Sequence, residues 1–506
     1  MTISALDPAH LTQKQLETTL WAAANALRGP VDPGDFKAYV FPVMFFKWIS
    51  DSWDHEHLRA IEDFGDALTD EIEADYHTFM IPEGCHWADV IETASQTGAK
   101  LDNAMQRIQQ ANPDALAGVF GDVQWANQER LPQSALAALL NSFHPVRLDP
   151  DSVNGDMLGS AYEYLLREFA EASGKKAGEF FTPRHVVHLL VKILDPKPGD
   201  TIADPACGSG GMLVETVTAV KEAGGDPRTL RLHGQEINLT TSAIAKMNLY
   251  LHGLKEFKVV RGDTFREPKL LEGDGLQKFD VVIANPPFSL QNWGAESWSD
   301  DPYGRVIGGV PPVSNADFAW IQHMIASMKE DTGRVGVVMP HGVLFREVGR
   351  EGTIREQLVR LNLLEAVIGL PNNLFYSTTI PVCLLIFRKK KPAERRNKVL
   401  FIDASKRLVS GKNQNTLSDD DIKVIDAAYK RGEDIDGEGR LSLRLVDLDE
   451  IEANGFDLKI GRYLKAESIA EVNVEEALIA YQEAREKFSV AEAVLADKLK
   501  AAGFVI

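Results

Sequence analysis

Short apolar runs alternate with longer amphipathic stretches through the middle of the chain, and this alternation is what most limits how it can fold. The runs are rich in β-branched residues and too short for typical helices, so they are predicted to be buried strands. The expected strands are 201–203, 231–235, 258–260, 281–284, 335–339, 364–368 and 382–387. The expected helices between them are 212–222, 240–252, 317–328 and 352–361. This order predicts an α/β domain with an open, mostly parallel sheet and helices on both faces, in which the last two strands could form an antiparallel edge.

The first 150 residues show no such alternation and are predicted to be helical. Thr12 and Gln15 form a capping box, which indicates that a helix begins there. A second helix begins near Pro33, is apolar on several sides and could bend at Pro42. This region could bind a partner or brace the following domain.

The last hundred residues are more polar and contain a second helical pattern. Charge rises between 418 and 438, which favours a surface helix and a linker. Asn473 and Glu476 then cap a helix whose seam alternates small and large residues. The small positions are Ala477, Ala484 and Ala491, and the large positions are Tyr481, Phe488 and Leu495. Such a helix could contact a partner in a coiled coil or pack on its own domain.

With 506 residues, the chain has room for about two to four domains. We expect a helical N-terminal domain over 1–150 and an α/β catalytic domain over 151–405. A linker with surface elements is expected over 406–472 and a C-terminal helix for subunit contact over 473–506.

The composition limits which partners and compartments are plausible. The formal net charge of −20 repels polyanions, so nucleic-acid binding would need a local basic groove or a partner that supplies positive surface. One basic run, 388–391 with Arg395, Arg396 and Lys398, could be a solvated turn or could contact phosphates. The cysteines, Cys85, Cys207 and Cys383, show no CxxC pairing, so we expect neither disulfides nor a metal site. No signal peptide or membrane span is apparent, which favours the cytoplasm.

A glycine-rich segment, 204–211, lies between the first expected strand and the next helix. Glycines at this position let the backbone turn tightly and approach a ligand closely, at the edge where open sheets bind nucleotides. The segment lacks the Gly-Lys-Ser/Thr of a phosphate-binding P-loop. Asp204 would repel a pyrophosphate, whereas it would suit a ligand that carries an ammonium and a sulfonium, such as S-adenosylmethionine.

Acidic residues also end the next two expected strands. Glu236 is placed to accept hydrogen bonds from ribose hydroxyls, and Asp263 is placed within reach of an adenine amino group. Each residue by itself could be an ordinary loop carboxylate. Their order with Asp204, at three successive strand ends, predicts one pocket.

The fourth strand ends in Asn285, Pro286, Pro287 and Phe288. The prolines fix the backbone and remove two amide donors, so the Asn285 side-chain oxygen and the Pro286 carbonyl can both accept hydrogen bonds. Phe288 adds a flat ring beside them. A Pro-Pro turn that merely closes a strand would look the same, and only the residues upstream favour a site for a planar ring with an amino group.

Taken together, these segments resemble the amino-group DNA methyltransferases, and more narrowly the modification subunit of type I restriction-modification systems. The resemblance rests on 178–184, 204–211, Glu236, Asp263 and 285–288 in this order. It extends to 314–318, 340–346, 370–375 and 460–463 and so covers almost the whole chain. It implies a class I, Rossmann-like S-adenosylmethionine-dependent methyltransferase fold.

The resemblance also implies roles for single residues. The residues implied in catalysis are Asn285, Pro286, Pro287 and Phe288. Those implied in binding S-adenosylmethionine are Glu179, Phe180, Phe181, Thr182, Pro183, Arg184, Asp204, Pro205, Cys207, Gly208, Ser209, Gly210, Glu236 and Asp263. Cys207 is expected to be a packed thiol and not a nucleophile.

The implied activity is N6 methylation of a flipped adenine in double-stranded DNA, with the target sequence supplied by a separate specificity subunit. The resemblance further implies a second copy of the chain, joined through that subunit, and a restriction subunit with nuclease and translocase activity. Two alternatives stay open at this point. One is a solitary methyltransferase acting on adenine N6 or cytosine N4, and the other is an assembly subunit that binds the cofactor without turnover.

Overall fold

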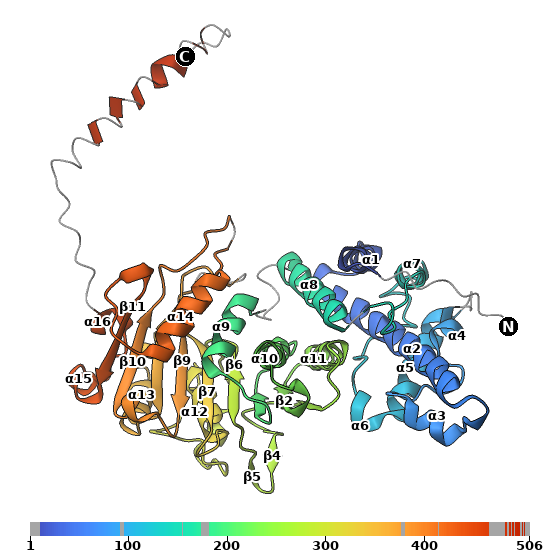
Figure 1. Cartoon of the computed structure of the whole chain (residues 1–506), viewed down its shortest axis with the longest axis horizontal. Helices are drawn as coiled ribbons and strands as arrows, with labels where there is room; N and C mark the ends of the chain where they lie inside the picture. The colour runs from blue at the N-terminus through green and yellow to red at the C-terminus, as the bar shows by residue number, and fades with distance from the viewer. Residues whose placement is uncertain are drawn as a thin grey trace.

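The computed structural model describes residues 11–91, 96–153, 155–173, 182–375, 380–412 and 414–464, with several residues between 481 and 500. A helical region built from the N-terminal third of the chain lies beside a region built around a large sheet (Figure 1). Within the described residues, no helix is both long and apolar enough to cross a membrane.

The helical region forms a core of its own. Its helices are α1 (Gln13–Ala26), α2 (Phe36–Phe64), α3 (Asp70–Tyr76), α4 (Trp87–Ile91), α5 (Thr97–Ala111), α6 (Pro113–Leu116), α7 (Gln133–Phe143) and α8 (Gly155–Ser173). The predicted capping box at Thr12 is present at the start of α1. Helix α2 runs through Pro42 without interruption, and residues 40–47 are all buried, because this stretch is apolar on nearly every side.

The sheet region contains one sheet of nine strands and a separate two-stranded ribbon. In the order of the sheet, the strands are β11 (Ser442–Asp447), β10 (Lys398–Asp403), β8 (Leu364–Gly369), β9 (Val382–Arg388), β7 (Arg334–Pro340), β6 (Val281–Ala284), β1 (Thr201–Asp204), β2 (Arg231–Glu236) and β3 (Phe257–Arg261). The ribbon pairs β4 (Leu271–Glu272) with β5 (Gly275–Leu276).

The mostly parallel sheet with an antiparallel edge is confirmed, but the edge is not made by the predicted strands. We expected the strands at 364–368 and 382–387 to end the sheet. Instead β9 lies inside it, antiparallel to both β7 and β8, and the edge strand is β11, which pairs antiparallel with β10. Six of the seven residues of β9 are buried, as expected for a strand in the interior of a sheet.

Helices cover both faces of the sheet (Figure 1). One face is covered by α9 (Arg184–Leu194), α10 (Gly211–Glu222), α11 (Leu239–Leu251) and α14 (Asp419–Arg431), and the other by α12 (Asp317–Ala326), α13 (Glu351–Arg360), α15 (Leu448–Ala453) and α16 (Ile460–Tyr463). Every residue of β6, β7 and β8 is therefore buried. Segment 406–472, predicted to hold a linker and surface elements, also contributes β11 to the sheet and the buried Ile425 of α14 to its core.

Helix α11 joins the two regions. Its Ala245 and Leu249 belong to the core beneath the sheet, whereas Ile244, Met247 and Tyr250 belong to the core of the helical region. Hydrogen bonds cross the same boundary, from Tyr162 Oη to the Ile244 carbonyl (3.0 Å) and from Lys246 Nζ to the Ala117 carbonyl (2.7 Å). The helical region and the sheet are consequently held in a fixed relation at this helix.

The chain reverses direction across the sheet at β1. From β1 it proceeds to β2 and β3 on one side, and it then returns to β6 and β7 on the other. The carboxyl ends of β1, β2 and β6 therefore open into a crevice, which is where open α/β sheets bind their ligands.

Candidate active site

The glycine-rich loop lies directly after β1 and leads into α10. Gly208 (φ +52°) and Gly210 (φ +79°) adopt left-handed backbone conformations that side chains disfavour. Their neighbours fix the loop against β2, because the Cys207 amide donates to the Gln235 carbonyl (3.1 Å) and the Gly208 amide donates to Glu236 Oε2 (3.0 Å). The loop thus has one defined path along the edge of the sheet.

Cys207 is packed, as predicted, and its thiol fills the space left by a glycine of β2. A Cβ on Gly234 would lie 2.9 Å from Cys207 Sγ, so only glycine fits there without movement. The thiol is 5% exposed, and burial raises its pKa well above the ordinary value. A thiol held in the neutral form is a poor nucleophile.

The three predicted carboxylates do lie at neighbouring strand ends. Asp204 is 2% exposed, and its Oδ1 accepts a hydrogen bond from the Ala206 amide (3.0 Å). Burial, with a smaller contribution from the negative charge of Glu236, raises the pKa of Asp204 to about 8. A cation next to Asp204 would remove the electrostatic penalty of ionising it.

Glu236 and Asp263 are both anchored by backbone amides. Glu236 accepts hydrogen bonds from the Gly208 (3.0 Å) and Asn238 (2.9 Å) amides, and burial raises its pKa. Asp263 accepts them from the Phe265 (2.9 Å) and Arg266 (3.1 Å) amides and pairs with the Arg266 guanidinium (3.0 Å). Both side chains are therefore held in place before any ligand binds.

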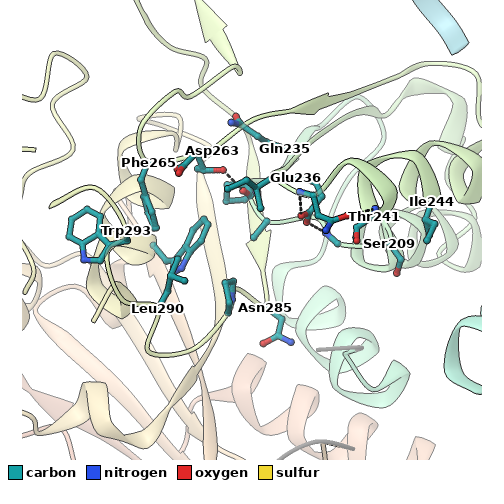
Figure 2. A pocket seen from close by; sticks show the side chains of 18 of the residues that line it. Ser209, Gln235, Glu236, Thr241, Ile244, Asp263, Phe265, Asn285, Leu290 and Trp293 are labelled. Atoms are coloured by element: carbon teal, nitrogen blue, oxygen red, sulfur yellow. Dashed lines mark hydrogen bonds between the residues drawn. The ribbon is translucent and has the colours of Figure 1, made fainter. Parts of the chain in front are cut away.

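A cavity of about 570 Å³ opens at these strand ends. Figure 2 shows Phe265 and Trp293 on one side of it, Ser209, Thr241 and Ile244 on the other, and Glu236 between them. A second cavity of about 80 Å³ is lined by Asp204, Thr182 and Arg184, among others. Both cavities are lined by Gly208, Ser209 and Asn285, so they are two compartments that meet at the glycine loop and the end of β6.

Asn285 stands where the compartments meet, and its amide group has a fixed orientation. Its Nδ2 donates a hydrogen bond to Thr182 Oγ1 (2.8 Å). Its Oδ1 is buried and accepts no hydrogen bond from any residue that the structure describes. A buried acceptor without a donor is costly, by about 1–3 kcal/mol, unless a ligand or water supplies the missing hydrogen.

The loop after Asn285 is hydrogen-bonded to the start of α12. Pro286 is buried, and the Ser289 amide, at φ +54°, donates to Asp317 Oδ1 (2.7 Å) at the start of α12. Asp317 is in turn paired with the Arg346 guanidinium (2.5 Å). Phe288 is half-buried and contacts Phe375 edge to face, with ring centroids 6.4 Å apart.

The structure describes the segment before α9 only from Thr182 onward. Glu179, Phe180 and Phe181 lie outside the described residues. Thr182 and Arg184 line the smaller cavity, and Pro183 caps α9 between them. Of the other predicted residues, Pro205 and Pro287 line the larger cavity, whereas Gly210, Pro286 and Phe288 lie next to the cavities without lining them.

Sequence reasoning missed the part of the wall that comes from the helical region. The larger cavity is also lined by Gly34 in the turn before α2, by Lys37 in the first turn of α2, and by Leu166 and Phe169 on α8. No local pattern distinguishes them from ordinary residues of a helical domain. Phe265 and Trp293 were missed too, although each lies only a few residues beyond a predicted site residue.

The basic run 388–398 is more buried than a solvated turn would be. Arg388 and Arg395 both pair with Glu365 of β8, which is 1% exposed. Lys391 is also buried and donates to Asn362 Oδ1 and to the Lys398 carbonyl, both at 2.8 Å. Three of the cations therefore hold β8, β9 and β10 together, because charges taken out of water need partners. Lys390 and Arg396 remain exposed.

The sheet order, the glycine loop after β1 and the Asn-Pro-Pro-Phe end of β6 together define a class I methyltransferase. Comparison with known proteins agrees. The model of the family described as N-6 DNA Methylase matches residues 153–472, and that of the HsdM N-terminal domain matches 16–143. The chain belongs to the N-6 DNA methylases and, within them, to the methylase subunits of type I restriction enzymes.

Individual relatives support this assignment. The chain is 34% identical over 520 residues to the type I restriction enzyme MjaVIII methylase subunit of Methanocaldococcus jannaschii, with 96% of this chain and 85% of the relative covered. It is 33% identical over 378 residues to the HindI methylase subunit of Haemophilus influenzae, covering 72% and 82% respectively. The crystal structure of a type I methyltransferase subunit from Streptococcus thermophilus superposes with a TM-score of 0.77 at 32% identity, covering 90% of this chain and all of that one.

Proposed function

We propose that this subunit transfers a methyl group from S-adenosylmethionine to the N6 amine of an adenine in double-stranded DNA. The observation that carries the proposal is the buried Asn285 Oδ1, which has no hydrogen-bond donor among the described residues and lies where the two cavities meet. An exocyclic amine offers the hydrogens that this atom lacks.

The two compartments suit the two ends of the cofactor. The smaller one, beside the buried Asp204, suits the cationic amino-acid end. In the larger one, Glu236 is placed for ribose hydroxyls, Asp263 for the adenine amine, and Phe265 for contact with the base. When bound, S-adenosylmethionine supplies an electrophilic methyl group on a sulfonium.

The chain's own contribution to the reaction is to orient the amine. An exocyclic amine conjugated to its ring is a weak nucleophile. If Asn285 Oδ1 and the Pro286 carbonyl each accept one of its hydrogens, the nitrogen lone pair turns out of conjugation toward the methyl group. This is positioning with electrostatic stabilisation of the charge that develops on nitrogen, so no strong base need act before attack. As the new nitrogen–carbon bond forms, the methyl–sulfur bond breaks, its electron pair stays on sulfur as a neutral thioether, and the methylated amine then loses one proton to water. Thr182 assists by holding the amide of Asn285 in the required orientation.

The target base must leave the duplex to reach Asn285, at an energetic cost of a few kcal/mol. Phe288, half-buried beside Phe375, is placed to stack on the flipped base, and such stacking is worth roughly 1–3 kcal/mol.

Replacing Asn285 by alanine tests the proposal. Methyl transfer by the complex with the specificity subunit should fall by about 100-fold or more, because a preorganised acceptor is lost, while cofactor affinity changes little. A product assay that separates N6-methyladenine from N4-methylcytosine identifies the base. Transfer that survives the substitution, or N4-methylcytosine as the product, would overturn the assignment.

Thr182 gives a matched pair of variants for the same step. Thr182→Val removes the hydroxyl that accepts from Asn285 Nδ2, whereas Thr182→Ser keeps it. We expect the valine variant to lose methyl transfer more strongly than cofactor binding, and the serine variant to retain both.

The acidic chain is proposed to depend on a separate specificity subunit for binding a defined DNA site. A net charge of −20 opposes binding to a polyanion. The described large residues of the C-terminal seam, Tyr481, Phe488 and Leu495, are 57–67% exposed and are available to a partner helix. We propose 473–506 as the contact segment and, through the specificity subunit, an assembly with a second copy and a restriction subunit. Efficient methylation of one DNA sequence by the chain alone would disprove this dependence.

A further inference from the structure

Two histidines and a glutamate meet in the helical region, away from both cavities. His57 lies on α2, Glu73 lies on α3, and His77 follows the end of α3. One possible ligand atom from each of them lies within 4.8 Å of the other two. None of the three lines either cavity, so methyl transfer does not account for them.

His77 is the best-defined member of this group. Its side chain is 1% exposed, and its Nδ1 lies 3.2 Å from Glu56 Oε2. A carboxylate can only accept, so Nδ1 carries the hydrogen, and in the neutral ring Nε2 presents a lone pair. That Nε2 is buried, makes no hydrogen bond with any described residue, and lies 3.7 Å from Glu73 Oε1. Two acceptor atoms therefore face each other, one buried and the other on a side chain that is 24% exposed.

The surrounding residues hold both imidazoles in place. Glu56 is itself fixed by the Thr78 hydroxyl (2.7 Å) and the Thr78 amide (3.1 Å). The rings of His57 and His77 both lie within 14° of parallel to the indole of Trp53, with centroids 5.2 Å and 4.3 Å away. A carboxylate that orients a histidine from behind is the usual second layer of a metal site.

We propose that His57, Glu73 and His77 bind a divalent transition-metal ion, with Zn²⁺ as the best match. Two imidazole nitrogens and one carboxylate oxygen are donors that zinc prefers, and a solvent molecule would complete the tetrahedron. Zinc–nitrogen bonds of about 2.0–2.1 Å place neighbouring ligand atoms roughly 3.3 Å apart, close to the 3.7 Å between His77 and Glu73.

Binding would join α2 to α3. His57 Nδ1 is hydrogen-bonded to Glu73 Oε1, and the ion would displace the proton that lies between them. Since the three ligands come from two elements that are separated in sequence, the bound ion would cross-link the end of the helical region and raise its stability.

The test uses the full chain without an affinity tag, stripped with a chelator and titrated with Zn²⁺. Calorimetry and elemental analysis should give one ion per chain, with a rise in melting temperature. His57→Gln, Glu73→Gln and His77→Gln should each weaken binding at least tenfold. His55→Gln, on the same helix but paired with Asp151 at 3.4 Å, is the matched control and should bind as the wild type does.

Trp53 offers a second readout that locates the ion. Co²⁺ should quench tryptophan fluorescence in the wild type, and Trp53→Phe should lose most of this quenching while keeping one bound ion. The proposal is overturned if the stripped wild type takes up no Zn²⁺, if His77→Gln binds it as tightly as the wild type, or if the quenching survives in Trp53→Phe. None of these readouts depends on methyl transfer, so the proposed function stands or falls separately.

Discussion

At the scale of single residues, the site contains buried polar groups that lack a natural partner among the described residues. Asp204 is almost fully buried, and burial raises its pKa to about 8 with no described cationic side chain to oppose the shift. Asn285 Oδ1 is buried and has no donor in the part of the chain that the structure describes. A protein that folded only for stability would replace both, because each is costly when empty. The two residues lie at neighbouring strand ends. Asp204 suits the cationic end of one ligand, and Asn285 suits the amine of a second molecule that approaches it.

The pKa of Asp204 leads to a prediction about proton release. Below about pH 8 the free carboxyl is protonated, and a cationic cofactor favours the ionised form, so binding near pH 7 should release about one proton. Affinity should accordingly rise with pH and level off above about pH 8. Calorimetry in two buffers of different ionisation enthalpy measures this release. Asp204→Asn should bind more weakly and release no proton; an unchanged release would assign it to another group.

Gly234 of β2 lies beneath Cys207 of the glycine loop and leaves no room for a Cβ. Gly234→Ala would place a Cβ 2.9 Å from Cys207 Sγ, so the loop should shift and cofactor affinity should fall, with a loss of stability of about 1–3 kcal/mol. Adding Cys207→Ala removes the sulfur and should restore much of both. Thermal unfolding and cofactor titration of the two single variants and the double variant provide the measurement. Without rescue in the double variant, this contact would not be the cause.

At the scale of elements, a buried ion cluster stabilises the sheet where β9 runs antiparallel to its neighbours. Glu365 of β8 accepts from Arg388 at the end of β9, from Arg395 and from the Tyr429 hydroxyl of α14. These three partners come from β9, from the turn that follows it and from α14. The interior position of β9 is therefore supported by charge pairing as well as by apolar packing.

Removing the shared carboxylate should release this cluster. Glu365→Ala leaves Arg395, which is 6% exposed, without its anionic partner, and we expect a loss of roughly 3–5 kcal/mol in unfolding free energy. Lys390→Gln belongs to the same basic run but alters an exposed side chain 3.4 Å from Asp331, so it should change stability by less than about 0.5 kcal/mol. Denaturant unfolding compares them. If both variants lost the same unfolding free energy, the buried pairs would not stabilise the fold more than the exposed pair does.

At the scale of the whole molecule, the helical region does more than brace the sheet. It shares α11 with the sheet and supplies part of the wall of the larger cavity, from the start of α2 and from α8. Figure 1 shows α11 and α10 between the sheet and the N-terminal helices. A partner that moved the helical region relative to the sheet would therefore change the shape of the cavity.

Substitutions of two buried phenylalanines can distinguish a role in shaping the cavity from a role in packing alone. Phe169 (3% exposed) and Phe143 (fully buried) belong to the same helical core, but only Phe169 lines the cavity. Phe169→Leu and Phe143→Leu should lower the melting temperature to a similar degree, because both leave a small void. Only Phe169→Leu should also weaken cofactor binding, by several-fold. If both variants bind the cofactor with the same affinity, the helical region does not shape the binding site.

The sequence by itself determined the elements and the order of the chemical groups. Hydrophobic periodicity predicted seven of the nine strands of the sheet and the helices between them, because it is local. The glycine loop, the strand-end carboxylates and Asn285 could be assigned to one edge because parallel strands bring their ends together. Only the tertiary structure decided what depends on distant pairing. It put β9 inside the sheet and β11 at its edge, and it buried Lys391 and Arg395. It also brought Lys37 and Phe169 to the cavity and left Asn285 Oδ1 without a donor among the residues that the structure describes. These outcomes rest on contacts between segments far apart in the chain, and no local pattern encodes such contacts.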